Sequence, residues 1–159
     1  MTLVILGTQD KSFDRLLRMV EKEIKNDNLK GDVIVQAGQT KYKSKYMQIF
    51  DLIPITKFNK LIKEADLVIT HGGVGSIIQA LNHNKKVIAV PRLARYKEHE
   101  NDHQLQIIEQ FTKDGYIISA KNSKELTQAL QNIKTFEPKK YKSNNNKMVK
   151  MIEDYIDNL

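Results

Sequence analysis

The sequence has no cysteine among its 159 residues. This absence excludes disulfide bonds, zinc–thiolate sites and a cysteine nucleophile, and it is compatible with a reducing compartment. No stretch approaches the roughly 18 apolar residues of a membrane-spanning helix, and Met1–Leu6 lacks the basic start of a signal peptide. We therefore expect a cytoplasmic protein whose chemistry comes from other side chains and from the backbone.

Motifs that often mark nucleotide binding are also missing. The sequence contains no G-x-G-x-x-G fingerprint, no loop ending in Gly-Lys-Ser/Thr, and no D-x-D pair of the kind that holds a metal–nucleotide complex. We therefore predict no metal site and no bound cofactor. If a diphosphate binds, a helix dipole and side chains must neutralise it.

The composition indicates one globular domain. Hydrophobic residues make up 40% of the chain and charged residues 28%, and 159 residues suit a single core. The net charge is +7, and six lysines but only one glutamate lie between Lys134 and Lys150. This basic segment favours either a solvated surface or an anionic partner such as membrane lipid or nucleic acid.

Short β-rich runs alternate with longer helical periods, which is typical of βα units around a mostly parallel sheet. We expect a Rossmann-like α/β fold with strands at 2–6, 32–36, 47–50, 66–70, 86–90 and 116–119. Residues 1–133 would form this domain, 134–146 a basic linker, and 147–159 a helix with one apolar stripe. The stripe favours docking onto the chain's own sheet, with binding to a partner as the alternative.

Three predicted helix starts carry the capping-box pattern, in which a side-chain acceptor stands three residues before Glu or Gln. They pair Ser76 with Gln79, Asn101 with Gln104, and Asn122 with Glu125. The glutamines of the first two pairs serve either as caps or as parts of a site.

The residues most informative about function follow the predicted strands, because ligands of open parallel sheets bind at the carboxyl ends of the strands. The segments there are Gly7-Thr8-Gln9, Gly38-Gln39-Thr40, His71-Gly72-Gly73-Val74-Gly75-Ser76, and the stretch from Pro91-Arg92 to Gln104. The third is the strongest candidate, since its glycines admit a ligand and the helix after it presents free N–H groups. It predicts a diphosphate cradle, with a purely steric turn as the alternative.

Two histidines in the fourth segment, His99 and His103, are four residues apart and flank Asp102. This spacing occurs in zinc sites, but no further convincing ligand accompanies the pair. The two imidazoles are better candidates for sugar binding or for acid–base chemistry, because histidine titrates near neutral pH.

The stretch ADLVITHGGVGSIIQAL, followed by KKVIAVPRLARYKEHENDHQLQ, resembles the C-terminal domain of glycosyltransferase family 28. It is similar in particular to the small catalytic subunits of two-chain transferases. These are the eukaryotic subunit that adds the second N-acetylglucosamine to a dolichol-linked oligosaccharide, and the PssE-like subunits of bacterial exopolysaccharide and capsule synthesis. The opening LVILGTQDKSFDRLL and the predicted strand VIVQAG are also typical of these subunits.

The resemblance implies the C-terminal half of an inverting GT-B glycosyltransferase that uses a UDP-sugar. It implies a donor site made of Thr8, Gln9, His71, Gly72, Gly73, Gly75, Ser76, Gln79, Asp102 and Gln104, with His99 and His103 as catalytic candidates. The wider family usually has glutamate at the position of Gln79, and the glutamine can still accept one hydrogen bond and donate another.

The resemblance further implies transfer of a hexose to a lipid-linked acceptor, with a membrane-associated subunit that binds the acceptor and recruits this chain to the cytoplasmic face. One alternative is a non-catalytic module that binds a nucleotide sugar and stabilises or regulates a partner transferase. A basic nucleic-acid-binding protein is a further alternative, and we expect no nucleic acid partner.

Overall fold

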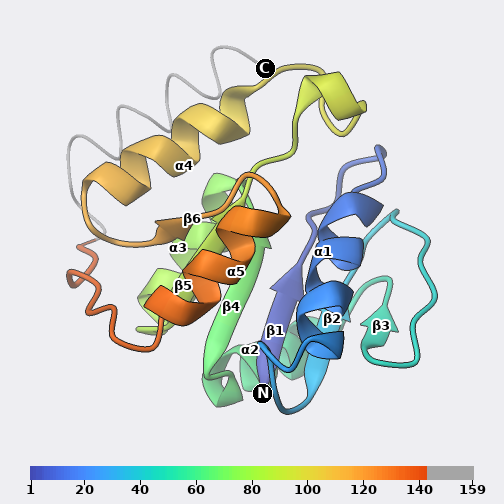
Figure 1. Ribbon diagram of the computed structural model, residues 1–159, viewed down its shortest axis with the longest axis horizontal. Helices are drawn as coiled ribbons and strands as arrows, with labels where there is room; N and C mark the ends of the chain where they lie inside the picture. Colours follow the sequence, from blue (N-terminus) through green and yellow to red (C-terminus); the bar gives the residue numbers. More distant parts are fainter. Residues whose placement is uncertain (143–159) are drawn as a thin grey trace.

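The computed structural model describes residues 1–142, which form a six-stranded sheet covered by helices on both faces (Figure 1). The strands are β1 (Thr2–Ile5), β2 (Val33–Gln36), β3 (Gln48–Phe50), β4 (Leu67–His71), β5 (Lys86–Val90) and β6 (Ile118–Ser119). The helices are α1 (Asp14–Lys25), α2 (Ile55–Glu64), α3 (Val74–Asn82), α4 (His103–Lys113) and α5 (Ser123–Asn132), with a 3₁₀ turn at Ala94–Tyr96. These bounds lie close to the predicted ones.

The strands run in the order β3-β2-β1-β4-β5-β6, and every neighbouring pair is parallel. The chain winds outward from β1 to β3 and then returns to place β4 on the other side of β1. The expected Rossmann-like α/β fold is confirmed. The strand order reverses direction between β1 and β4. A crevice is therefore expected beyond the carboxyl ends of these two strands.

Two apolar layers sandwich the sheet. In β1 and just after it, Leu3 and Ile5 belong to the apolar layer built with α2, α3 and α4, whereas Val4 and Leu6 belong to the layer built with α1 and α5. All four side chains are buried. Burial on both faces explains why the central strands β1, β4 and β5 are nearly continuous apolar runs.

Two of the three predicted capping boxes are wrong. Helix α3 begins at Val74 with Gly73 as its N-cap, so Ser76 lies inside the first turn. Helix α4 has Asp102 as its N-cap, and the side chain of Gln104 turns into the protein. The pattern failed because these side chains have other partners: Ser76 contacts the His71 ring, and the buried Gln104 accepts from the N–H groups of Gly72 and Arg92.

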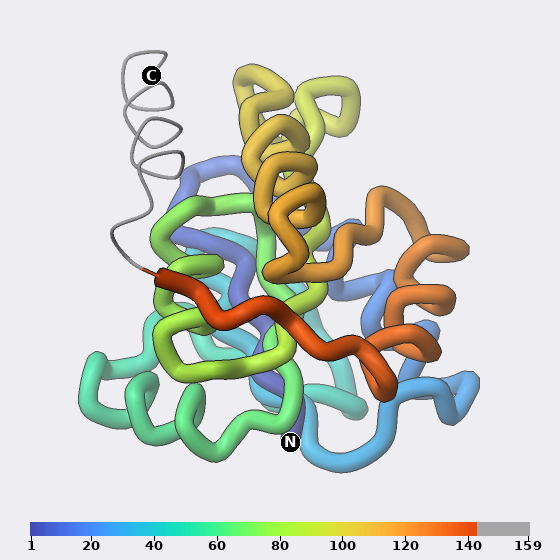
Figure 2. Tube along the Cα trace, turned by 90° about the vertical axis from the view of Figure 1, so that its left-hand side faces the viewer, coloured from blue at the N-terminus to red at the C-terminus, as the bar shows by residue number. Residues whose placement is uncertain are grey.

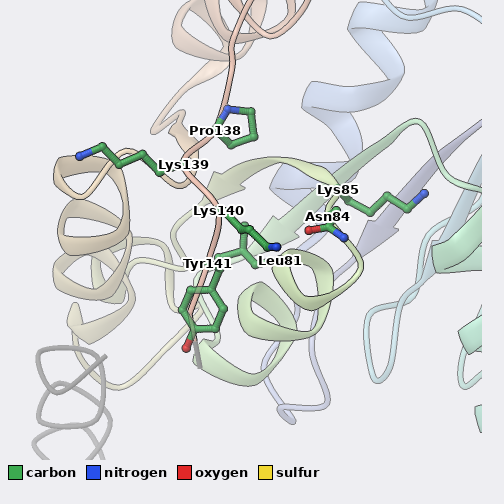
Figure 3. A pocket seen from close by; sticks show the side chains of 7 residues that line it. All are labelled: Leu81, Asn84, Lys85, Pro138, Lys139, Lys140 and Tyr141. Carbon is green, nitrogen blue, oxygen red and sulfur yellow. The ribbon is translucent and has the colours of Figure 1, made fainter. Parts of the chain in front are cut away.

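Residues 134–142 follow α5 without helix or strand and pass beside the turn after α3 (Figure 2). Tyr141 packs its ring against Tyr116, with 5.5 Å between the ring centroids. A cavity of about 380 Å³ lies between residues 138–141 and the end of α3, and its lining includes Leu81 and Asn84 (Figure 3). The predicted helix 147–159 and the end of the predicted linker lie outside the described residues.

None of the helices within residues 1–142 is long and apolar enough to cross a membrane. This observation agrees with the sequence, in which no long apolar run occurs.

The third capping box is confirmed, and it generates a stability prediction. The side chain of Asn122 accepts a hydrogen bond of 2.9 Å from the Glu125 N–H at the start of α5. Replacing Asn122 by alanine should lower the free energy of unfolding by about 1 kcal/mol, because the first turn of α5 loses its cap. Urea denaturation measures the loss, and Asn122→Asp should retain most of the stability; equal stability of all three proteins would contradict the assignment.

Candidate functional site

Glycine-containing loops meet at the carboxyl ends of β1, β2 and β4. A Cβ atom added to Gly38 would collide with the carbonyl oxygen of Gly7, and one added to Gly7 would lie 2.7 Å from the His71 ring. Gly7 and Gly38 also have positive φ angles, +85° and +58°. Both positions therefore require glycine for packing and backbone conformation, which lets the loops close over the sheet.

His71 ends β4 and lies beneath these loops with 6% of its surface exposed. Its ring packs against both Gly7 and Gly73, so a Cβ on either glycine would collide with it. Its Nδ1 lies 3.0 Å from Nε2 of Gln104, and its Nε2 lies 3.3 Å from Oγ of Ser76. The expected donor-site residue His71 is thus a buried support for the glycine turn.

The protonation of His71 follows from its partners. Gln104 uses its carbonyl oxygen to accept two backbone N–H groups, so its amide nitrogen must donate to Nδ1 of His71. Nε2 of His71 then carries the proton and donates to Ser76 Oγ, which leaves the Ser76 hydroxyl proton to point elsewhere. Burial, with a smaller contribution from the Arg92 charge, lowers the pKa of His71 to about 3 and keeps the ring neutral.

Gln104 joins three segments of the site. Its Oε1 accepts from the N–H of Gly72 at 2.9 Å and from the N–H of Arg92 at 3.1 Å. The side chain is completely buried, so it lies beneath the expected donor site. Through this one amide, the loops after β4 and β5 are fixed to the first turn of α4.

Arg92 is fully buried and holds the neighbouring loops through main-chain carbonyls. Its guanidinium donates to the carbonyl oxygens of Leu6 at 2.6 Å, Lys11 at 2.7 Å and Glu98 at 3.0 Å. Burial lowers the pKa of Arg92 to about 10, and the Glu98 carboxylate opposes that shift, so the side chain stays charged at neutral pH. The loop after β1 and the loop after β5 are therefore tied to the same cation.

A second arginine reinforces this arrangement from α1. Arg15 makes a bidentate pair with the buried Glu98 carboxylate, at 2.9 and 3.0 Å, and also donates to the carbonyl of Pro91. Sequence reasoning assigned no role to Arg15, Arg92 or Glu98. The position of Arg92 in the loop after β5 was a usable signal. Nothing in the sequence links Arg15 to Pro91 and Glu98, which lie more than seventy residues away.

The loops held by Arg92 enclose a pocket of about 210 Å³, lined by Gln9, Asp10, Lys11, His99 and Glu100. His99 is 7% exposed, and its Nδ1 accepts a 3.3 Å bond from the Asn101 N–H. Its Nε2 has no hydrogen-bond partner within residues 1–142. Burial, followed by the Arg92 charge, lowers the pKa of His99, which favours the neutral imidazole.

The other expected site residues lie around these two groups. Thr8 lines a separate pocket of about 160 Å³ with Gly38, Gln39 and Lys41. Gln79 is half-buried one turn beyond Ser76, and Asp102 accepts from the Ala94 N–H at 2.9 Å. His103 opens α4, with its N–H bonded to the Asn101 side chain.

Gly75 differs from the other glycines of its turn. It lies exposed in the first turn of α3, and an added Cβ would meet nothing of the described chain within 4 Å. Packing therefore gives no reason for glycine at this helical position. Within residues 1–142, no group of three His, Cys, Asp or Glu side chains is arranged to hold a metal ion.

The depressed pKa of His71 makes a prediction about stability. Below pH 6.5 the unfolded chain binds a proton that the native His71 refuses until about pH 3. Stability should therefore fall with decreasing pH across this window, and His71 should contribute about 1.4 kcal/mol per pH unit. His71→Asn keeps an acceptor for Gln104 and removes the titration, so urea unfolding between pH 7 and pH 4.5 should show a shallower decline for the variant; parallel declines would contradict the assignment.

Comparison with known proteins places this geometry in a family. The model of the glycosyltransferase family 28 C-terminal domain matches residues 1–159. The UDP-N-acetylglucosamine transferase subunit ALG13 of Candida albicans is 33% identical over 117 residues. That match covers 74% of this chain and 38% of the relative, so the chain spans well under half of the relative's length.

Solved structures show the same fold. A solution structure of ALG13 has a TM-score of 0.60 and 20% identity, and the match covers 95% of this chain and 93% of that one. MurG of Acinetobacter baumannii has a TM-score of 0.55 and 18% identity, over 83% of this chain and 40% of that one. The fold matches the C-terminal Rossmann-like domain of GT-B glycosyltransferases, and on the family match the chain belongs to glycosyltransferase family 28 as a C-terminal domain.

Proposed function

We propose that this chain is the donor-binding, catalytic subunit of a two-chain inverting transferase that moves a hexose from a UDP-sugar. The family supports a UDP-sugar glycosyltransferase, and the Candida albicans relative is named as a subunit of a UDP-N-acetylglucosamine transferase. The match covers only 38% of that relative, so its activity cannot be transferred to this chain directly. We infer the transferase activity of this chain from the geometry of its own site.

The start of α3 is the observation that carries the proposal. Gly75 is exposed there with open space over its α-carbon, so packing does not require glycine, although glycine forms helices less well than alanine. The helix N-terminus offers unpaired N–H groups and a partial positive charge, and Ser76 offers a hydroxyl proton. A diphosphate seated against Gly72, Gly73, Gly75 and Ser76 accounts for all of these features.

The remaining residues would act around the bound diphosphate. Gln79, one turn further along α3, would meet the ribose, while Thr8 and Gln9 would line the cleft beside the β1 loop. Asp102 and His103, together with His99, would lie toward the donor sugar. Gln104 and His71 would hold the turn in place from beneath.

The reaction needs two forms of assistance. An acceptor hydroxyl attacks the anomeric carbon as the bond to UDP breaks, so negative charge gathers on the diphosphate while the hydroxyl loses its proton. The α3 N-terminus and the Ser76 hydroxyl would stabilise the departing diphosphate, and this charge stabilisation needs no resident metal. A base on His103 or on the partner subunit would take the proton.

We further propose that the acceptor is a lipid-linked saccharide, presented by a membrane-associated subunit at the cytoplasmic face during exopolysaccharide or capsule synthesis. One Rossmann-like domain forms one wall of a cleft, and alignment of the attacking hydroxyl requires the other. The similarity to a named subunit of a UDP-N-acetylglucosamine transferase supports the two-chain arrangement, whereas the exopolysaccharide or capsule setting rests on the sequence motifs alone. A regulatory module that binds a nucleotide sugar without turnover is the second candidate.

Calorimetry with UDP in the presence of a chelator tests the diphosphate site. Wild-type protein should bind UDP without divalent metal, and Ser76→Asp should weaken binding at least tenfold because its carboxylate opposes the phosphates. Gly75→Ala should also weaken binding while the helix becomes no less stable, since alanine is the better helix former. Gln128→Ala, on an exposed position of α5, is the matched control; UDP affinity that disappears with the metal, or is unaffected by Ser76→Asp, would refute the cradle.

Transfer assays with and without the partner subunit test whether this chain binds the donor while the partner supplies the acceptor. The isolated chain should bind UDP yet transfer little sugar to a lipid-linked acceptor, and adding the subunit should raise turnover at least a hundredfold by aligning the acceptor. In the complex, His103→Ala should lower turnover without dissociating the subunits if this chain is catalytic. Full turnover by the isolated chain would refute the two-chain proposal, and full turnover by the variant would refute the catalytic role of His103.

A further inference from the structure

The exposed apolar side chains gather in one short segment. Within residues 1–142, the large hydrophobic side chains that face solvent are Tyr46, Phe50, Leu52, Ile55 and Tyr96. Four of these five lie within residues 46–55, at the β3 edge of the sheet (Figure 1). Leu52 lines the same pocket as Thr8 and so belongs to the cleft. The other three have no role in the donor site, although the Ile55 side chain is 67% exposed.

Lysines surround these apolar side chains. Residues 41–60 contain five lysines and one acidic residue, Asp51, so this stretch carries +4 while the whole chain carries +7. The five, all exposed, are Lys41, Lys43, Lys45, Lys57 and Lys60. Lys57 Nζ lies 4.7 Å from the centre of the Phe50 ring, and Lys45 Nζ lies 5.4 Å from that of Tyr46. Ammonium groups therefore border the exposed rings directly.

The fold holds the first three of these lysines outward. Residues 41–45 alternate between exposed lysines and half-buried side chains. The half-buried Tyr42 and Ser44 donate from their hydroxyls to the Glu21 carboxylate of α1, at 2.9 and 2.6 Å. Glu21 is also paired with Lys25 of the same helix, at 3.8 Å. The inward side chains thus fix the segment against α1, and the lysines between them face solvent.

An anionic lipid bilayer is the partner that fits this combination. The negative surface potential of the bilayer attracts lysines, while aromatic and aliphatic side chains enter the boundary between headgroups and acyl chains. Lysine is depleted at protein–protein interfaces. Nucleic acid bases stack on aromatic rings, whereas the aliphatic Ile55 offers no ring. Membrane lipid therefore accounts for both the lysines and the apolar side chains.

We propose that residues 41–60 form a membrane-contact surface, in which the lysines bind anionic lipid headgroups and the three apolar side chains enter the headgroup boundary. The surface adjoins the cleft, because Lys41 lines the same pocket as Thr8. The chain then touches the bilayer directly and does not depend on a partner subunit alone for recruitment. This contact goes beyond the proposed function and is independent of UDP binding.

Flotation with lipid vesicles tests the proposal. The full chain should bind vesicles that contain about one-third phosphatidylglycerol and scarcely bind pure phosphatidylcholine, and added salt should release it, because the lysines respond to the anionic surface. The double variant Lys43→Gln, Lys45→Gln should bind about thirtyfold more weakly, at roughly fivefold per lysine.

A second pair of lysines provides the matched control. The double variant Lys113→Gln, Lys124→Gln removes the same charge from exposed positions of α4 and α5, helices that contact the opposite edge strand β6. It should bind the anionic vesicles within about threefold of the wild-type chain, because charges far from the contact are screened.

Tryptophan fluorescence measures insertion, since the chain has no tryptophan of its own. The emission of Phe50→Trp should move to shorter wavelength on anionic vesicles and should be quenched by brominated acyl chains, because the ring leaves water. Gln128→Trp, at an exposed position of α5, should show neither change. Ile55→Gln should weaken vesicle binding about tenfold through the loss of apolar burial.

Thermal unfolding and UDP calorimetry separate the possible failures. All variants should unfold like the wild-type chain, because each substituted side chain is exposed. A folded chain that binds anionic vesicles through this surface but not UDP overturns the proposed function and leaves this inference standing. Four results overturn the inference alone: no binding to anionic vesicles, equal losses in the two lysine pairs, unchanged emission of Phe50→Trp, or tighter binding to a single-stranded oligonucleotide than to vesicles through Lys43 and Lys45.

Discussion

The buried guanidinium of Arg92 is the interaction on which the carboxyl edge of the sheet depends. A charged group in the interior is tolerated only when it is paired and hydrogen-bonded, and Arg92 meets that condition with three carbonyl oxygens and with Glu98 close by. Phe13 covers the guanidinium, with its ring centroid 4.9 Å away. Removing any partner would leave a buried charge unsatisfied, so the surrounding loops are constrained together.

A network of uncharged side chains also holds the glycine turn in place. Gln104 and His71 form a chain of hydrogen bonds that ends at Ser76. The amide nitrogen of Gln104 donates to Nδ1 of His71, and the proton of His71 therefore lies on Nε2, facing Ser76. Because the His71 ring stays neutral, it adds no positive charge beneath the glycine turn. The α3 N-terminus and the Ser76 hydroxyl are then the groups of the turn itself that can donate to an anion.

The fold could be predicted from the sequence because strand periodicity and helix periodicity are local and strong, and strands buried on both faces are conspicuous. The carboxyl-end loops were predicted for the same reason. The capping boxes at Ser76 and Asn101 failed, since a local pattern cannot reveal that Gln104 finds better partners in Gly72 and Arg92. The support given by Arg15 to Glu98 was also beyond reach, because the contact joins residues distant in the chain.

Arg92 binds the loops through main-chain carbonyl oxygens. The anchoring of each loop therefore does not depend on which side chain stands at the anchored position. Every residue type presents a carbonyl, so the anchor at Lys11 does not require lysine. The neighbouring positions Gln9 and Asp10 can accept substitutions while the loop keeps its path. The scaffold is thus suited to evolutionary diversification, in which the recognition surface changes and the framework that displays it persists.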